Sequence, residues 1–166
     1  MSRGPGAQSG DAVRAVMVDD HPVVRAGLRA MLGEDDGIQV VAEAAHGNEA
    51  VDVVARLVTE GNPPDLVLMD LQMGEGMDGV AATRQLRQRC PGVPVLILTT
   101  YDTEADILAA VEAGASGYML KDAAPEEIHR AVHAAAQGRT ALAPAVAARL
   151  MGRMRDESTS LSTREV

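Results

Sequence analysis

The segment Val13–Asp20 reads Val-Arg-Ala-Val-Met-Val-Asp-Asp, a short and mostly apolar run that ends in two carboxylates. The pattern returns at Leu66–Asp70, which reads Leu-Val-Leu-Met-Asp. Such continuous apolar runs are typical of strands that are covered on both faces, because half-exposed strands alternate apolar and polar residues. Longer stretches with helical periodicity separate the runs. Crossovers of that length allow the strands to pair in parallel.

Five strand–helix units follow one another in this way. Strands are predicted at residues 13–18, 38–44, 66–69, 93–98 and 117–120. Helices are predicted at residues 22–32, 48–59, 79–89, 103–113 and 125–137. The alternation predicts an α/β fold with a doubly wound parallel sheet. Sheets of this kind carry their chemistry outside the carboxyl ends of the strands.

Composition excludes several classes of function. Aromatic residues make up 1% of the 166 residues, so the core is aliphatic and a base-stacking platform is not expected. The net charge of −9 repels DNA. No apolar run approaches the ~20 residues that span a bilayer, and the first residues do not form a signal peptide. The single cysteine, Cys90, excludes an internal disulfide. We therefore expect a cytoplasmic protein without a membrane partner.

Polar residues stand where four of the predicted strands end. They are Asp19, Asp20, Asp70, Thr99 and Lys121, and Lys121 is the only lysine of the chain. A lone aspartate after a strand usually caps a turn or helix, but five positions at one sheet edge favour a site. Clustered carboxylates need a counter-charge, and oxygen ligands in an open cleft favour Mg²⁺. One carboxylate could then be the nucleophile toward a phosphoryl donor, with the ammonium and the hydroxyl neutralising the phosphoryl oxygens.

Four segments resemble the receiver domain of bacterial two-component response regulators. They are Val18-Asp19-Asp20-His21, Leu68-Met69-Asp70, Leu96-Ile97-Leu98-Thr99 and Gly114–Asp122. The Asp-Asp-His opening, the Lys-Asp pair and the tail Leu161–Val166 are similar to the NarL/FixJ class, which carries a LuxR-type helix-turn-helix output. The resemblance implies a flavodoxin-like fold with five parallel strands in the order 2-1-3-4-5.

The resemblance also implies a role for each site residue. Asp70 matches the phosphoacceptor, and its donor is a sensor histidine kinase or a small acyl phosphate. Mg²⁺ is held by Asp70, by Asp20 directly, by Asp19 through water and by the backbone carbonyl of Gln72. Lys121 matches the phosphate-contacting lysine. The switch pair is Thr99 and Tyr118. The hydroxyl of Thr99 moves to the phosphoryl group, and the ring of Tyr118 then turns inward. The implied protein is a transcription regulator rather than an enzyme.

The resemblance divides the chain into a tail (1–12), a receiver domain (13–138), a helix and linker (139–160) and the start of a truncated DNA-binding domain (161–166). The helix of the third part is expected at residues 144–154 from its apolar spacing. DNA would be contacted only through the missing domain. Activation is expected to produce a homodimer.

The loop after the acceptor departs from the family pattern. It reads Met73-Gly74-Glu75-Gly76-Met77-Asp78-Gly79, without the usual proline and with one added residue. Two glycines predict a mobile loop that closes less firmly over a phosphoryl group, or one that bulges outward. This departure supports an alternative, an atypical receiver that acts as a phosphorylation-independent interaction module. A second alternative, a haloacid-dehalogenase-type phosphatase, requires a second aspartate where Gln72 stands.

Other candidate residues receive structural interpretations. We expect His21 to begin the first helix rather than to take part in chemistry. His129 and His133 lie four residues apart on the last receiver helix, and we expect a solvated or interface face there rather than a metal site. Cys90 beside Pro91 is expected in a turn.

Overall fold

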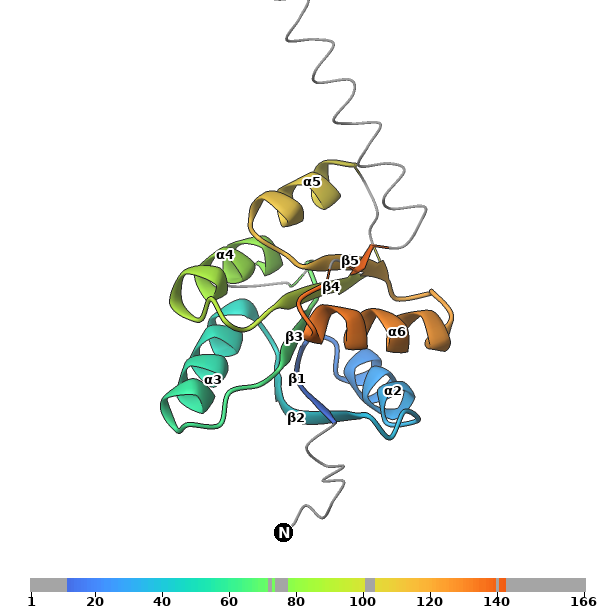
Figure 1. Ribbon diagram of the computed structural model, residues 1–166. Helices are drawn as coiled ribbons and strands as arrows, with labels where there is room; N and C mark the ends of the chain where they lie inside the picture. The colour runs from blue at the N-terminus through green and yellow to red at the C-terminus, as the bar shows by residue number, and fades with distance from the viewer. Residues whose placement is uncertain (1–11, 72, 74–77, 101–103, 140, 143–166) are drawn as a thin grey trace, which may run out of the picture.

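The computed structural model describes residues 12–71, 73, 78–100, 104–139 and 141–142, in which strands and helices alternate along the chain (Figure 1). The strands are β1 (Val13–Val18), β2 (Ile38–Ala44), β3 (Leu66–Met69), β4 (Val95–Thr99), β5 (Gly117–Leu120) and β6 (Ala141–Leu142). The helices are α2 (Pro22–Leu32), α3 (Gly47–Thr59), α4 (Gly79–Arg89), α5 (Glu104–Glu112) and α6 (Pro125–Ala136).

The strands form one parallel sheet in the order β2-β1-β3-β4-β5-β6. The first five strands confirm the predicted flavodoxin-like order 2-1-3-4-5. The two-residue strand β6 was not predicted, and it lies in the stretch that we expected to be helix and linker. Gly138 has a φ of 84°, a value that favours glycine, and it turns the chain out of α6 toward β5. The predicted helix at 144–154 lies outside the described residues.

Successive strand residues serve the two faces of the sheet. In β1, Val16 and Val18 belong to the core cluster that includes residues of helices α3, α4 and α5, whereas Ala15 and Met17 belong to the cluster that includes residues of α2 and α6. Strands β3 and β4 alternate in the same way. All these side chains are buried, so both faces are covered and the continuous apolar runs of the sequence are explained (Figure 1).

The fourth strand begins and ends later than predicted. Residues 93 and 94 belong to the preceding turn, because the Val93 N–H donates to the Cys90 carbonyl and Pro94 has no N–H to donate. At the other end, the Thr99 carbonyl accepts from the Lys121 N–H at 2.8 Å, so Thr99 is part of β4. The register thereby places Thr99 beside the end of β5.

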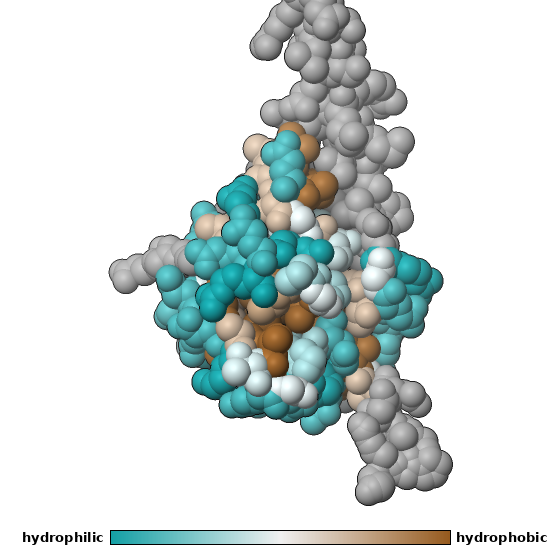
Figure 2. Space-filling view, turned by 60° about the vertical axis from the view of Figure 1, so that its left-hand side comes forward, coloured by the Kyte–Doolittle hydropathy of each residue, from teal (hydrophilic) through white to brown (hydrophobic). Residues whose placement is uncertain are grey.

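The outer surface is mainly hydrophilic on the side shown in Figure 2, with a small hydrophobic area set into it. This distribution agrees with a core that is built almost entirely from aliphatic side chains. None of the described helices has both the length and the apolar character needed to cross a membrane.

Candidate functional site

Two buried carboxylates lie side by side at the carboxyl edge of the sheet. Asp19 follows β1 and Asp70 follows β3, and these strands are neighbours with Val18 opposite Met69. The Asp70 N–H donates to the Val18 carbonyl at 3.1 Å, which continues the ladder beyond the strand. Asp19 is 1% exposed and Asp70 is 4% exposed. Buried carboxylates are costly unless they are paired, so a compensating charge is required here.

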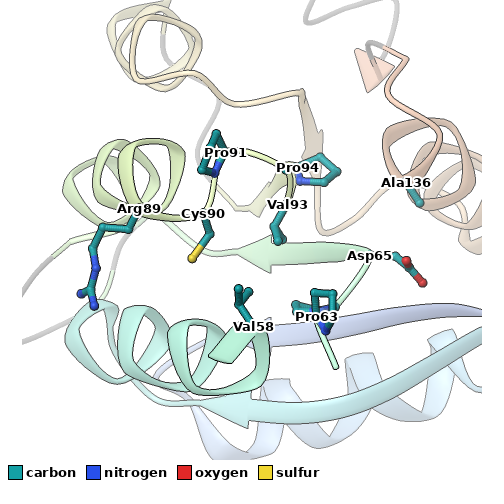
Figure 3. Close-up of a pocket in the computed structure, with 11 residues that line it drawn as sticks. Val58, Pro63, Asp65, Arg89, Cys90, Pro91, Val93, Pro94 and Ala136 are labelled. Carbon is teal, nitrogen blue, oxygen red and sulfur yellow. The ribbon is translucent and has the colours of Figure 1, made fainter. Parts of the chain in front are cut away.

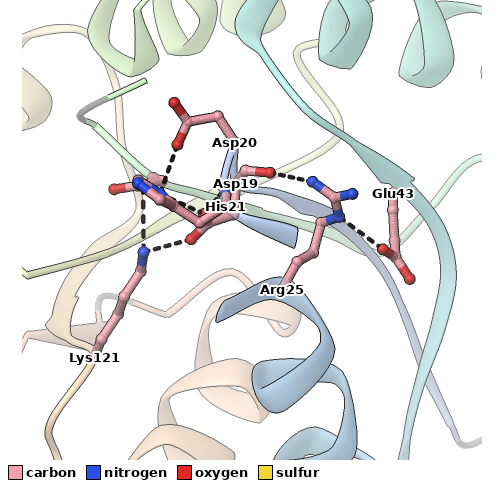
Figure 4. A network of polar contacts seen from close by, with 7 residues as sticks. Asp19, Asp20, His21, Arg25, Glu43 and Lys121 are labelled. Carbon is pink, nitrogen blue, oxygen red and sulfur yellow. Dashed lines mark hydrogen bonds and ion pairs between the residues drawn. The ribbon is translucent and has the colours of Figure 1, made fainter. Parts of the chain in front are cut away.

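Lys121 supplies that charge from the end of β5. Its Nζ donates to Asp19 Oδ2 and lies 3.2 Å from Asp70 Oδ2. Burial lowers the pKa of Lys121, but the hydrogen bond to Asp19 and the charges of Asp70 and Asp19 outweigh it, so the pKa stays above its ordinary value. The only lysine of the chain is therefore a charged bridge between the two buried acids, and Figure 4 shows Lys121 beside Asp19.

Asp20 and His21 complete the mouth of the cluster. His21 Nδ1 lies 2.8 Å from Asp20 Oδ1 and 3.5 Å from Asp19 Oδ1, and the His21 N–H donates to Asp19 Oδ1 at 2.9 Å. His21 is the N-cap residue of α2, as expected. Its imidazole points at the carboxylates (Figure 4), and the expectation that it takes no part in the chemistry stays a prediction.

Sequence reasoning missed the support behind the acidic pair. Arg25 in α2 donates to the backbone carbonyl of Asp19 and pairs with Glu43 of β2 at 2.9 Å. Arg29 pairs with the other oxygen of Glu43 at 2.6 Å. The contacts of Arg25 hold the first turn of α2 against the sheet and fix the carbonyl of Asp19 (Figure 4). The available signal was Glu43, a single acidic residue in the otherwise apolar second half of β2.

The two predicted switch residues are buried in neighbouring strands. Thr99 ends β4 beside Lys121, and its side chain is fully buried. Tyr118 of β5 is also fully buried and packs in the cluster that contains Ile107 and Ala110 of α5. The ring of Tyr118 therefore occupies an inward position in this structure.

The loop that departs from the family pattern is pinned where it rejoins the fold. The Gly79 N–H donates to the Leu71 carbonyl at 3.2 Å, and Thr83 Oγ1 donates to the Gly79 carbonyl at 2.7 Å. Asp78 caps α4 by accepting from the Ala81 N–H at 2.8 Å. Gln72 and residues 74–77 lie outside the described residues, so the predicted carbonyl ligand and the expected looseness of the loop remain predictions.

The cluster has the donor set of a divalent cation site. Asp19, Asp20, His21 and Asp70 each offer one ligand atom, and these atoms all lie within 4.8 Å of one another. Carboxylate oxygens are suitable ligands for Mg²⁺. The residues present therefore fit the cation that the sequence predicts.

Two other predicted features lie away from this site. Cys90 ends α4 and is buried beside Pro91, as expected for a turn residue, at a hollow of about 400 Å³ at the opposite, amino edge of the sheet (Figure 3). His129 faces the end of α2, and His133 faces the turn that follows α2, so the expected interface face lies within the domain. Their Nε2 atoms lie 2.9 Å from the Met31 carbonyl and 3.0 Å from Asp35 Oδ2.

Comparisons with known proteins identify the family. Residues 15–133 match the response regulator receiver domain. A transcriptional regulatory protein of Bacillus subtilis, YhcZ, is 45% identical over 116 residues, which cover 70% of this chain and 51% of that protein. The response regulator ChrA of a heme-sensing two-component system is 54% identical with a TM-score of 0.70, covering 86% of this chain and 66% of that one.

A LuxR-family two-component response regulator from Aurantimonas is 38% identical with a TM-score of 0.78, and the match covers 86% of this chain and 98% of that structure. The chain thus belongs to the response regulator receiver family. It is the receiver domain of a regulator of the NarL/LuxR class. The chain spans about half the length of YhcZ and two thirds that of ChrA.

Proposed function

We propose that this chain is a phosphorylation-activated switch of a two-component system, with Asp70 as the phosphoacceptor. A carboxylate oxygen of Asp70 attacks the phosphorus of a phosphohistidine on a sensor kinase. The P–N bond breaks, the leaving imidazole keeps the electron pair, and a P–O bond forms to Asp70. Asp70 needs no general base for this step, because it reacts as the carboxylate.

The observation that carries the proposal is the bridge made by Lys121. Its Nζ contacts both Asp19 and Asp70, which come from different strands. An ammonium at this position lies beside the oxygens that would be transferred to Asp70, and it can neutralise their charge. A purely structural ion pair needs one acid, whereas this lysine reaches two that are both buried.

The cation would be held by Asp20 and Asp70 directly, by Asp19 through water and by the backbone carbonyl of Gln72. Its chemistry at this site is neutralisation of phosphoryl oxygens. Lys121 and the Thr99 hydroxyl would orient the remaining oxygens. Arg25 keeps the Asp19 backbone in place by donating to its carbonyl.

The output would follow from movement of Thr99 toward the phosphoryl group and a coupled shift of Tyr118. We propose that this shift favours a homodimer and controls a LuxR-type DNA-binding domain, so that the whole cytoplasmic protein regulates transcription. The name of YhcZ as a transcriptional regulatory protein supports this output.

The test is phosphorylation of the purified chain by acetyl phosphate with Mg²⁺, followed by intact-mass measurement. The wild type is expected to gain one phosphoryl group, and Asp70→Asn to gain none. Asp52→Asn, an exposed aspartate on α3, is the matched control and should label normally. An unlabelled wild type would favour the phosphorylation-independent interaction module. Labelling of Asp70→Asn would move the acceptor elsewhere.

A further inference from the structure

His21 is turned away from its own helix and toward the acids. In the part of the chain that the structure describes, two helices start at a histidine N-cap, α2 at His21 and α3 at His46. His46 caps its helix, because its Nδ1 accepts from the Glu49 N–H at 3.3 Å. His21 makes no such capping bond, and its Nδ1 lies 2.8 Å from Asp20 Oδ1. The difference shows that something other than helix capping orients the His21 ring.

The separations around His21 are close to those in the ligand shell of a single ion. Neighbouring ligands of an octahedral cation with bonds of ~2.1 Å lie about 3 Å apart, and opposite ligands lie about 4.2 Å apart. The Nδ1 of His21 and the Oδ1 of Asp20 are separated by 2.8 Å, close to the neighbouring distance. The whole set, including Asp19 and Asp70, lies within 4.8 Å, which exceeds the opposite-ligand distance of such a shell by at most about 0.6 Å. The imidazole nitrogen thus belongs to the same shell of donor atoms as the carboxylates.

We infer that His21 Nδ1 is a protein ligand of the divalent cation at this site. The inference rests on the proposed function, since it concerns the cation that would serve Asp70. A nitrogen donor changes which ions the site prefers. Oxygen-only sites suit Mg²⁺, whereas imidazole favours later first-row ions such as Co²⁺ and Ni²⁺. His21 therefore raises the affinity for these ions relative to Mg²⁺.

A different role for His21 makes the opposite prediction. If the ring is protonated and only neutralises Asp20, an incoming cation must displace it, and removing the ring would strengthen cation binding. If the ring is a ligand, removing it weakens binding, most of all for Co²⁺. The exposed position of His21, 66% for its side chain, means that its truncation leaves no cavity in the core.

The experiment uses the full 166-residue chain without a histidine tag, and compares wild type, His21→Ala and the matched control His46→Ala. Pulsed electron paramagnetic resonance of bound Mn²⁺ detects a directly coordinated ¹⁴N nucleus. Calorimetric titrations with Co²⁺ and with Mg²⁺ give the ratio of the two affinities. We expect a nitrogen coupling in the wild type and in His46→Ala, and none in His21→Ala. The ratio of Co²⁺ to Mg²⁺ affinity should fall about tenfold in His21→Ala.

Absence of the nitrogen coupling in the wild type would overturn the inference, and so would an unchanged affinity ratio or tighter binding by His21→Ala. If His21→Ala fails to fold, the wild-type resonance spectrum alone decides. Labelling by acetyl phosphate and Mg²⁺ separates the two proposals. A wild type that labels on Asp70 without a nitrogen coupling refutes only the role of His21. A wild type that neither binds a cation nor labels refutes both.

Discussion

Replacing Gly79 by alanine is expected to damage the acceptor site, because α4 touches the backbone of Asp70 at this glycine. A Cβ on Gly79 would lie 2.2 Å from the Asp70 carbonyl oxygen and 2.7 Å from the Cα of Leu71. Real Cβ contacts almost never fall below 3.0 Å, so the helix and the acceptor strand must separate by roughly 0.8 Å. Both groups are backbone, and no side chain can rotate to relieve the clash.

The expected loss of stability is the difference between the cost of overpacking and the gain in helix propensity. Overpacking of this kind costs ~1–3 kcal/mol, and the backbone contact places Gly79→Ala near the upper end. Alanine recovers at most ~1 kcal/mol through its higher helix propensity. We therefore expect a net loss of about 2 kcal/mol in the free energy of unfolding. A displacement near 1 Å at the acceptor also slows phosphoryl transfer, by roughly ten- to a hundredfold.

Urea denaturation followed by circular dichroism measures the stability, since the chain has no tryptophan to report by fluorescence. The rate of labelling by acetyl phosphate measures the second effect. Gly27→Ala is the control, because Gly27 lies inside α2 with nothing within 4 Å of its added Cβ. The free energy of unfolding of Gly27→Ala should rise by up to ~1 kcal/mol, and its labelling rate should equal that of the wild type. Wild-type stability and labelling in Gly79→Ala would refute the reasoning.

Three further substitutions test the ion pairs and the pinned loop. Lys121→Met leaves two buried carboxylates without their ammonium and should cost ~3 kcal/mol by urea denaturation, with Mg²⁺ restoring part of the loss. The pKa of Lys121 is raised in the folded protein, so its contribution to the free energy of unfolding is complete below the ordinary pKa of 10.5 and is lost as the pH rises through the folded pKa. The difference in stability between wild type and Lys121→Met should therefore disappear at that pH. Asp35 has a lowered pKa, owing to the Gly37 N–H and to His133, so its contribution is present above 3.8 and is lost at lower pH. Acid titration of Asp35→Asn should lack that loss. Thr83→Val removes a buried hydroxyl bond and should cost ~1 kcal/mol in the same urea assay.

The fold was predictable because its signals are local. The runs at β1 and β3 are apolar without interruption, and only a sheet covered on both faces buries all of their side chains. The boundaries that failed depend on single backbone hydrogen bonds. Strand β4 begins at Val95 and not at Val93, because the Val93 N–H donates within a turn and Pro94 has no N–H to donate. The hydrophobicity of Val93 does not predict this boundary. The strand β6 contains two residues, too few for any periodicity to show.

The site was predictable in its members and less so in its contacts. Parallel topology brings the ends of β1, β3 and β5 to one edge, so the meeting of Asp19, Asp70 and Lys121 follows from the strand assignment. The bond from Arg25 to the Asp19 carbonyl depends on the way α2 leaves the sheet, which no spacing rule supplies. The need for glycine at position 79 is likewise a property of packing, since it arises from a carbonyl nine residues earlier in the chain.

Charge, more than shape, would drive the proposed switch. The acids Asp19, Asp20 and Asp70 and one ammonium leave two negative charges in excess at the sheet edge. A divalent cation would balance that excess. Phosphorylation of Asp70 would replace one negative charge by roughly 1.5 to 2, and the balance would be lost again. The buried hydroxyl of Thr99 stands at the adjacent strand end, so in the proposed switch its movement toward the phosphoryl group would offset the added charge.

The same reasoning predicts that Asp70→Glu does not mimic the phosphorylated state. Glutamate carries a single negative charge, as aspartate does, so it lengthens the side chain without disturbing the charge balance. We expect Asp70→Glu to keep the association state of the untreated wild type in light scattering, whereas beryllofluoride-treated wild type shifts toward the dimer. If Asp70→Glu dimerises as strongly as the treated wild type, then side-chain length at position 70 is the trigger. The electrostatic account of the switch would then have to be abandoned.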